Sequence, residues 1–82
     1  METTNKEVSV QRPYRHFKGK LDYVHDVMMH TETGERLAYY QDLYEPYDMF
    51  VRPLNMFIEK VDSNRKDNIT KQTYRFELFD GV

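Results

Sequence analysis

The fold is decided by residues 21–44, which read LDYVHDVMMHTETGERLAYYQDLY. In residues 21–30 the odd positions are mostly apolar and the even positions are mixed, so a period of two fits better than a helical period. The polar loop TETGE, residues 31–35, places Gly34 where a short hairpin needs a left-handed residue. Residues 36–44 alternate again. We therefore predict two antiparallel strands joined by a tight turn, with a bulge near Asp26 that switches the inward face.

The chain that follows this hairpin predicts a further strand and an ambiguous segment. EPYD, residues 45–48, is a turn, and MFVR, residues 49–52, is a strand that ends because the next residue is a proline without a donor. Residues 54–61 fit the helical template, yet a helix of about two turns gains little without packing. We therefore expect one helical or 3-10 turn over residues 53–56 and a strand over residues 57–61.

A last strand is predicted for TYRFELF, residues 73–79. The sum is an all-β protein of five to six short antiparallel strands with one short helical or 3-10 turn. Such a pattern is typical of a small barrel or sandwich, and closing the sheet would remove exposed edges. A chain of 82 residues suffices for one domain, which we place at residues 13–80 after a flexible N-terminal tail at residues 1–12.

Four motifs of the chain resemble a known family. They are YRHFKG at 14–19, HTETGE at 30–35, YYQDLY at 39–44 and FVRPLNMFIEKV at 50–61. In this order they are similar to the signature of the bacterial family known as domain of unknown function 1653. The resemblance implies a small SH3-like β-barrel and implies no activity. Phe50 stands where such sequences tend to carry tryptophan, and Asp26 stands where a small residue such as glycine is expected.

The composition predicts a soluble, cytoplasmic protein without a membrane partner. The chain has no cysteine, which suits a reducing compartment. Its first ten residues, METTNKEVSV, lack the basic and apolar regions of a secretory signal. The longest apolar runs are too short to span a bilayer.

The sequence predicts neither catalytic residues nor a metal site. Ser9 lies in the tail and Ser63 in a polar turn, so neither forms a nucleophile elbow. His25 and His30 point to opposite faces of an unbroken strand. Asp26 and His30 share a face but lie roughly 13 Å apart, too far to bind one ion. We therefore predict a non-enzymatic protein without a cofactor or a metal.

Charge is distributed unevenly along the chain. Residues 11–20 carry +4, whereas residues 21–50 carry −6. One alternative function is a nucleic-acid-binding module that uses the basic-aromatic segment 12–20, with Arg12, Arg15, Lys18 and Lys20 on phosphates and Tyr14 or Phe17 for stacking. The acidic middle of the chain would repel phosphates. The basic charge is explained more simply by pairing with carboxylates of a neighbouring strand.

The preferred function is a binding or accessory module for a protein or peptide partner. Its candidate surface is aromatic with flanking acids, and consists of Tyr40, Tyr44, Tyr47 and Phe50 with Asp42, Glu45 and Asp48. Tyrosine faces suit polyproline helices, and acids suit basic flanks. The same surface would serve as a homodimer seam. The competing interpretation is that alternate tyrosines belong to the core.

Arg52 stands inside a mostly apolar run. We expect it to pair with a carboxylate of a neighbouring strand, Asp42 or Glu59, because its planar fork suits such pairing. The alternative is that Arg52 anchors an anionic ligand. A second alternative function is therefore a small-molecule or enzymatic site around His16, His30 and Arg52. Arg15 and His16 are candidate binding residues whose role the sequence leaves open.

Overall fold

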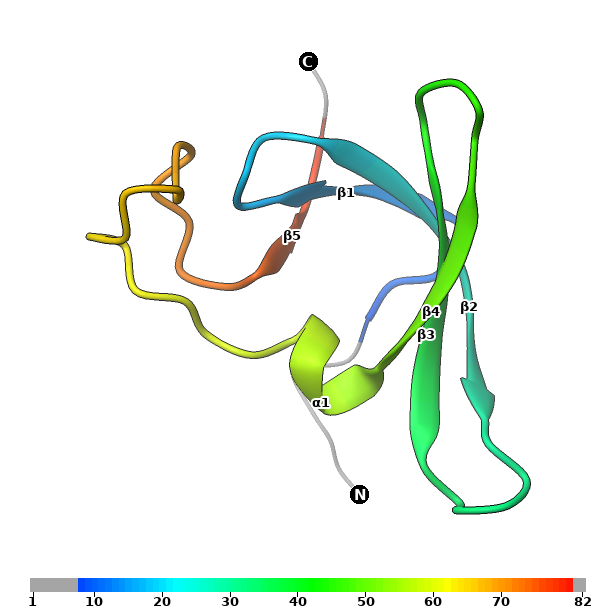
Figure 1. Ribbon diagram of the computed structural model, residues 1–82. Coiled ribbons are helices and arrows are strands. Elements are labelled where there is room, and N and C mark those ends of the chain that lie inside the picture. Colours follow the sequence, from blue (N-terminus) through cyan, green and yellow to red (C-terminus); the bar gives the residue numbers. More distant parts are fainter. Residues whose placement is uncertain (1–7, 81–82) are drawn as a thin grey trace.

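The computed structural model describes residues 8–80 as a curled antiparallel sheet with one helical turn (Figure 1). The elements are β1 (Arg12–His16), β2 (Leu21–Met29), β3 (Arg36–Asp42), β4 (Met49–Pro53), α1 (Leu54–Phe57) and β5 (Phe76–Leu78). The five strands lie in the order β4-β3-β2-β1-β5. The predicted all-β class and the short helical turn are confirmed.

β2 and β3 form the hairpin that the sequence predicts. The His30 N–H donates to the Glu35 carbonyl oxygen at 2.7 Å, and the Gly34 N–H donates to the His30 carbonyl oxygen at 2.8 Å. Gly34 has a φ of +73°, a left-handed conformation that glycine adopts without strain. The β2–β3 register shifts between Val24 and Asp26, which confirms the predicted bulge.

Before the bulge, the inward side chains of β2 stand at even positions, although the odd positions are more apolar. Asp22 and Val24 are 4% and 0% exposed. Their neighbours across the ladder, Asp42 and Tyr40, belong to the same face of β3. This register brings two carboxylates, Asp22 and Asp42, opposite each other at one end of the sheet.

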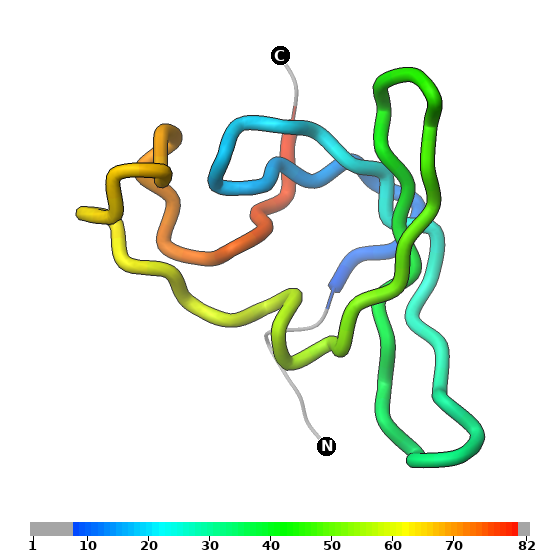
Figure 2. Tube along the Cα trace, viewed as in Figure 1, coloured from blue at the N-terminus to red at the C-terminus, as the bar shows by residue number. Residues whose placement is uncertain are grey.

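The sheet curls without closing into a complete barrel (Figure 2). Within residues 8–80 no ladder joins β4 to β5. The gap is spanned by an isolated bridge between Lys60 and Tyr74, with the Arg75 N–H donating to the Glu59 carbonyl oxygen at 2.9 Å. The strand predicted for residues 57–61 is therefore wrong. Phe57 still belongs to α1 and its side chain is buried, so only the end of that segment can pair.

The core is a cluster of rings with two aliphatic residues. Its buried members are Tyr14, Val24, Ala38, Tyr40, Phe57 and Phe76. Phe57 and Phe76 stack with centroids 4.0 Å apart, and Tyr40 lies 5.4 Å from each of them. Phe17 is 1% exposed. Tyr14 and Phe17 are thus core residues, and neither presents a face on which a base would stack.

The predicted tail falls partly outside the described residues, which begin at Val8. Val8 packs against the core cluster. The Ser9 N–H donates to the Tyr14 hydroxyl at 2.8 Å, and the Gln11 N–H donates to the Val24 carbonyl oxygen at 2.6 Å. The chain just before β1 is therefore held against the sheet by hydrogen bonds and apolar contact.

Residues 62–72 form a loop that two buried amides hold together. Asn68 is 0% exposed and Gln72 is 3% exposed. The Asn68 amide donates to the carbonyl oxygens of Asp62 and Gln72, at 3.1 and 2.9 Å. The Gln72 amide donates to the Arg15 carbonyl oxygen at 3.0 Å and accepts from Arg15 Nε at 3.0 Å. These bonds dock the loop on β1.

Candidate binding pocket

A pocket of about 400 Å³ opens inside the curl of the sheet. It is lined by His16, Lys18, Lys20, Asp22, Tyr40, Asp42, Phe50, Arg52 and Phe76. These residues come from all five strands and from the turn between β1 and β2. The curl therefore brings together side chains that are far apart in the sequence.

Arg52 reaches the pocket from β4 without a carboxylate partner in residues 8–80. Its Nε donates to the Tyr40 hydroxyl at 3.2 Å, and its guanidinium lies 5.6 Å from the centroid of Phe76. The ion pair expected with Asp42 or Glu59 is therefore wrong. Glu59 is taken by Arg75, which the bridge between residues 60 and 74 places beside it.

His16 is neutral at physiological pH. Burial lowers its pKa from 6.5 to about 4, and the positive charges of Arg52, Arg75 and Lys18 add to the effect. Its Nδ1 accepts from the Lys18 N–H at 3.1 Å, so the neutral ring carries its proton on Nε2. The ring packs against Phe76, 4.9 Å between centroids. His16 thus offers one uncharged donor beside the cationic groups.

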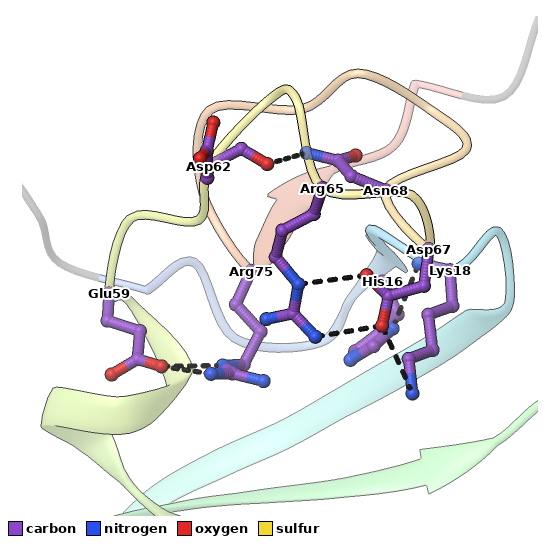
Figure 3. A network of polar contacts seen from close by, with 8 residues as sticks. All are labelled: His16, Lys18, Glu59, Asp62, Arg65, Asp67, Asn68 and Arg75. Atoms are coloured by element: carbon purple, nitrogen blue, oxygen red, sulfur yellow. Dashed lines mark hydrogen bonds and ion pairs between the residues drawn. The ribbon is translucent and has the colours of Figure 1, made fainter.

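Lys18 is tied to the loop that covers β1 (Figure 3). Asp67 lies between Lys18 and Arg65, at 3.8 Å from the ammonium group and 2.8 Å from two guanidinium nitrogens. Figure 3 shows His16 next to this cluster, and it also shows the separate Arg75–Glu59 pair. The bidentate Arg65 contact lowers the pKa of Asp67. Lys18 therefore shares the single negative charge of Asp67 with Arg65.

Asp22 is a buried acid at the pocket wall. Its Oδ1 has no hydrogen-bond partner within the described chain. Burial, followed by the hydrogen bond and negative charge of Asp42, raises the pKa of Asp22 to about 7, while Lys20 and Arg52 oppose the shift. The Asp22 carboxyl, which lies opposite Asp42 in the ladder, is therefore partly protonated near neutral pH.

The remaining candidate residues fall into separate places. Tyr44, Tyr47 and Phe50 are 45%, 50% and 41% exposed. Leu43, Met49 and Val51 extend this exposed surface over β4 and the loop before it. Tyr40 is 6% exposed, so it belongs to the core and only borders the pocket. Of the four aromatic residues predicted for this surface, Tyr44, Tyr47 and Phe50 are therefore exposed, and Tyr40 is not.

His30 and Arg15 do not line the pocket. His30 lies at the β2–β3 turn, where its Nδ1 accepts from the Glu32 N–H at 3.1 Å. That turn lies at the bottom of Figure 1, away from the turn between β1 and β2. Arg15 is engaged with Gln72 and lies 5.8 Å from the Phe79 ring centroid. Of the trio His16, His30 and Arg52, the structure brings together only His16 and Arg52.

The pocket also contains residues that sequence reasoning did not assign to a site. These are Asp22 and Phe76. The sequence places Lys18 and Lys20 in a nucleic-acid site and Asp42 at the flank of the aromatic surface, and the structure brings all three to the pocket. Asp22 is recognisable as unusual because it is an inward-facing acid directly opposite another acid, a pairing that destabilises a sheet. This pairing can be identified only once the β2–β3 register is known.

A family model described as "Protein of unknown function (DUF1653)" matches residues 12–78. The chain belongs to this family. The match confirms the resemblance carried by the four motifs. No curated protein and no solved structure matches the DUF1653 chain significantly.

Two features of the described part of this DUF1653 protein bear on its chemistry. Residues 8–80 contain no cluster of three or more histidine or acidic residues arranged to hold a metal ion. No helix among them is long and apolar enough to cross a bilayer. The family description specifies no activity.

Proposed function

We propose that the protein is a binding module whose pocket holds the anionic group of a small organic ligand. The observation that supports this proposal most directly is Arg52, a guanidinium group in a pocket without an ion pair in residues 8–80. An arginine fork binds carboxylate, phosphate and sulfonate groups through two parallel hydrogen bonds. Its Nε is already used by Tyr40, which leaves the two terminal nitrogens for a ligand.

The balance of charge around the pocket favours an anion. Lys20 and Arg52 have no ion-pair partner within the described residues, and Lys18 adds part of a charge. Against them stand Asp42 and Asp22, and Asp22 is partly protonated near neutral pH because its pKa is raised to about 7. Cationic groups therefore exceed the negative charge, and His16 contributes a neutral donor.

The apolar part of the pocket favours an aromatic ligand. Phe50 is 41% exposed at the rim, and Phe76 and Tyr40 form the wall behind it. The centroids of Tyr40 and Phe50 are 5.6 Å apart. Small-molecule sites are mostly apolar concavities of about 300–1,000 Å³ with a few convergent polar groups. The pocket, at about 400 Å³, lies within this range.

Binding without chemical transformation is the function we propose. The lining contains no serine, threonine or cysteine that would act as a nucleophile. The raised pKa of Asp22 is explained by its burial and by the neighbouring Asp42, without a reaction.

A sharp test uses benzenesulfonate and benzenesulfonamide as probes. They are nearly isosteric, but only the sulfonate is charged near neutral pH. We expect NMR titration of the labelled protein to show sulfonate binding at residues that line the pocket. Arg52→Gln should weaken it at least about tenfold, because a charge-assisted hydrogen bond contributes about 1.5–3 kcal/mol.

The matched control is Arg36→Gln. Arg36 is exposed at the start of β3 and does not line the pocket. It should leave the affinity within about twofold of the parent, since a distant exposed charge is largely screened. Equal affinity for the sulfonate and the neutral amide, or equal losses in both variants, would contradict the proposal.

A second candidate function rests on a different observation. Leu43, Tyr44, Tyr47, Met49, Phe50 and Val51 are all exposed large apolar residues. They lie on β4 and the loop before it, and β4 is an edge strand of the sheet. We propose that an extended peptide with basic flanks pairs with this edge, since edge strands accept added strands and Glu45 and Asp48 stand beside it.

The nucleic-acid alternative receives less support. Its two stacking residues, Tyr14 and Phe17, are buried. Three of its four basic residues contact other parts of the chain: Arg12 lies 3.8 Å from Asp80, Arg15 bonds to Gln72, and Lys18 lies 3.8 Å from Asp67. A module of this kind needs exposed rings and unpaired cations along one strip.

A further inference from the structure

Asp22 and Asp42 form an unusual pair at the wall of the pocket. They are directly opposite in the antiparallel β2–β3 ladder. Like charges in this position destabilise a sheet. Asp22 is 4% exposed, and its Oδ1 has no hydrogen-bond partner in residues 8–80. Because a buried polar atom is normally satisfied, this orphaned oxygen beside an open cavity needs an explanation.

The titratable groups around the pair come from β1, from β4 and from the turn between β1 and β2. Lys20 approaches from the turn before β2, and Arg52 approaches from β4. His16 faces the same cavity from β1 and is neutral. Lys18 also lines the cavity, and its ammonium group lies 3.8 Å from Asp67. Because the pKa of Asp22 is raised to about 7, the charge of the pair changes near neutral pH. As Asp22 loses its proton, the pair goes from one negative charge to two.

We propose that the pocket takes up its aromatic anion together with a proton that stays on the Asp22–Asp42 pair. This inference rests on the proposed function and adds the regulation of the same site. The proton comes from solvent, remains on the carboxyl pair, and returns to solvent when the ligand leaves. The only bond formed is the O–H bond of the carboxyl group, and it breaks again when the proton returns to solvent.

The physical reason is repulsion between negative charges at short range. An anion held by Arg52 stands in the same cavity as the carboxyl pair, so a second charge on the pair opposes it strongly in a partly buried site. Ligand binding then favours the protonated pair, and protonation favours the ligand by the same factor. The affinity for the anion falls as the pH rises through about 7.

Benzenesulfonate is again the appropriate probe, because its own charge does not change over the range of interest. We expect its dissociation constant to rise about tenfold between about pH 6 and about pH 8.5, the equivalent of one unit of pKa shift in the pair. Asp22→Asn removes the titrating proton. It should bind at the higher pH about as tightly as the parent does at the lower pH.

A second variant separates the acid pair from the neighbouring imidazole. His16→Gln should retain most of the parent's pH dependence, because its ring does not supply the proton. The inference would be overturned if the affinity of His16→Gln no longer depended on pH, or if the affinity of Asp22→Asn still did. Either result would leave the proposed anion binding intact. Absence of sulfonate binding at every pH would instead remove the proposed function, and the inference with it.

A measurement on the parent protein covers the case in which Asp22→Asn fails to fold. Calorimetric titrations in two buffers of different ionisation enthalpy report the number of protons taken up with the ligand. Net uptake near about pH 7.5 supports the inference, since the unliganded pair is then partly deprotonated. Binding with no net uptake at that pH overturns it.

Discussion

At the scale of single residues, the described chain is held together by polar side chains that the hydrophobic pattern does not reveal. Asn68 is an example, since it is fully buried in a loop between two short extended segments. Its Oδ1 accepts from the Gln72 N–H at 3.1 Å, and its amide donates to two carbonyl oxygens. The loop thereby receives a fixed shape and presents Asp67 to Lys18.

Replacing Asn68 by alanine should destabilise the protein by about 2–3 kcal/mol, because it leaves a buried N–H and two carbonyls without their partner. The control is Asn64→Ala in the same loop, where the side chain is exposed and makes no hydrogen bond within the described residues. Urea unfolding of both variants measures the difference. Equal stability of the two variants would contradict the role assigned to Asn68.

At the scale of elements, β4 contributes residues to both of the proposed binding sites. Arg52 points its guanidinium to the pocket, whereas Met49 and Val51 are 58% and 55% exposed. One side of the strand therefore completes the pocket. The other side and the free edge form the surface proposed for peptide binding.

Val51→Lys should weaken the binding of extended peptides selected from a displayed random library by at least about tenfold in affinity, or abolish their selection. The reason is that a charge placed on an apolar contact is desolvated unfavourably. Its folding stability should change by less than about 0.5 kcal/mol, because the site is exposed. Met29→Lys, 64% exposed at the far end of β2, is the control.

The outcome distinguishes two occupants of the β4 edge. Peptides with an apolar run and basic flanks, lost in Val51→Lys but retained in Met29→Lys, would support the proposal. A monomer–dimer equilibrium in sedimentation that Val51→Lys alone disrupts would instead identify a second copy of the chain as the occupant. Peptides retained by Val51→Lys would rule out the edge.

At the scale of the whole molecule, the pocket makes folding stability depend on pH. The pKa of Asp22 is raised in the folded state, so its stabilising effect is complete at low pH and is lost as the pH rises through about 7. The pKa of His16 is lowered, so its effect is present above 6.5 and is lost as the pH falls towards about 4. The two effects oppose each other only in the acidic range.

The free energy of unfolding should therefore rise as the pH is lowered from about 8 to about 6.5, where the acid pair titrates and His16 remains neutral. Asp22→Asn should remove this rise, and the difference between the two proteins measures the contribution of Asp22. Denaturant unfolding at a series of pH values tests it. A parent and a variant with parallel pH profiles would contradict the proton assigned to the pair.

The sequence predicts the local elements well, because their causes are local. Gly34 is needed for the left-handed turn, alternation defines the two strands around it, and Pro53 ends β4. The prediction fails for residues 57–61, where packing of Phe57 against Phe76 outweighs the preference for an extended strand. The sequence-based prediction of an ion pair for Arg52 fails as well, because the neighbours of Arg52 depend on how the sheet curls.

Sequence pattern alone is sufficient to predict the all-β class, the β2–β3 hairpin with its bulge, and membership of the DUF1653 family. Which candidate residues share a site depends on the three-dimensional fold. His16, Asp22 and Arg52 lie on three different strands, and the curl of the sheet is what brings them to one cavity. The physical reason is that strand alternation specifies a face, whereas register and curvature, which depend on the whole core, specify neighbours.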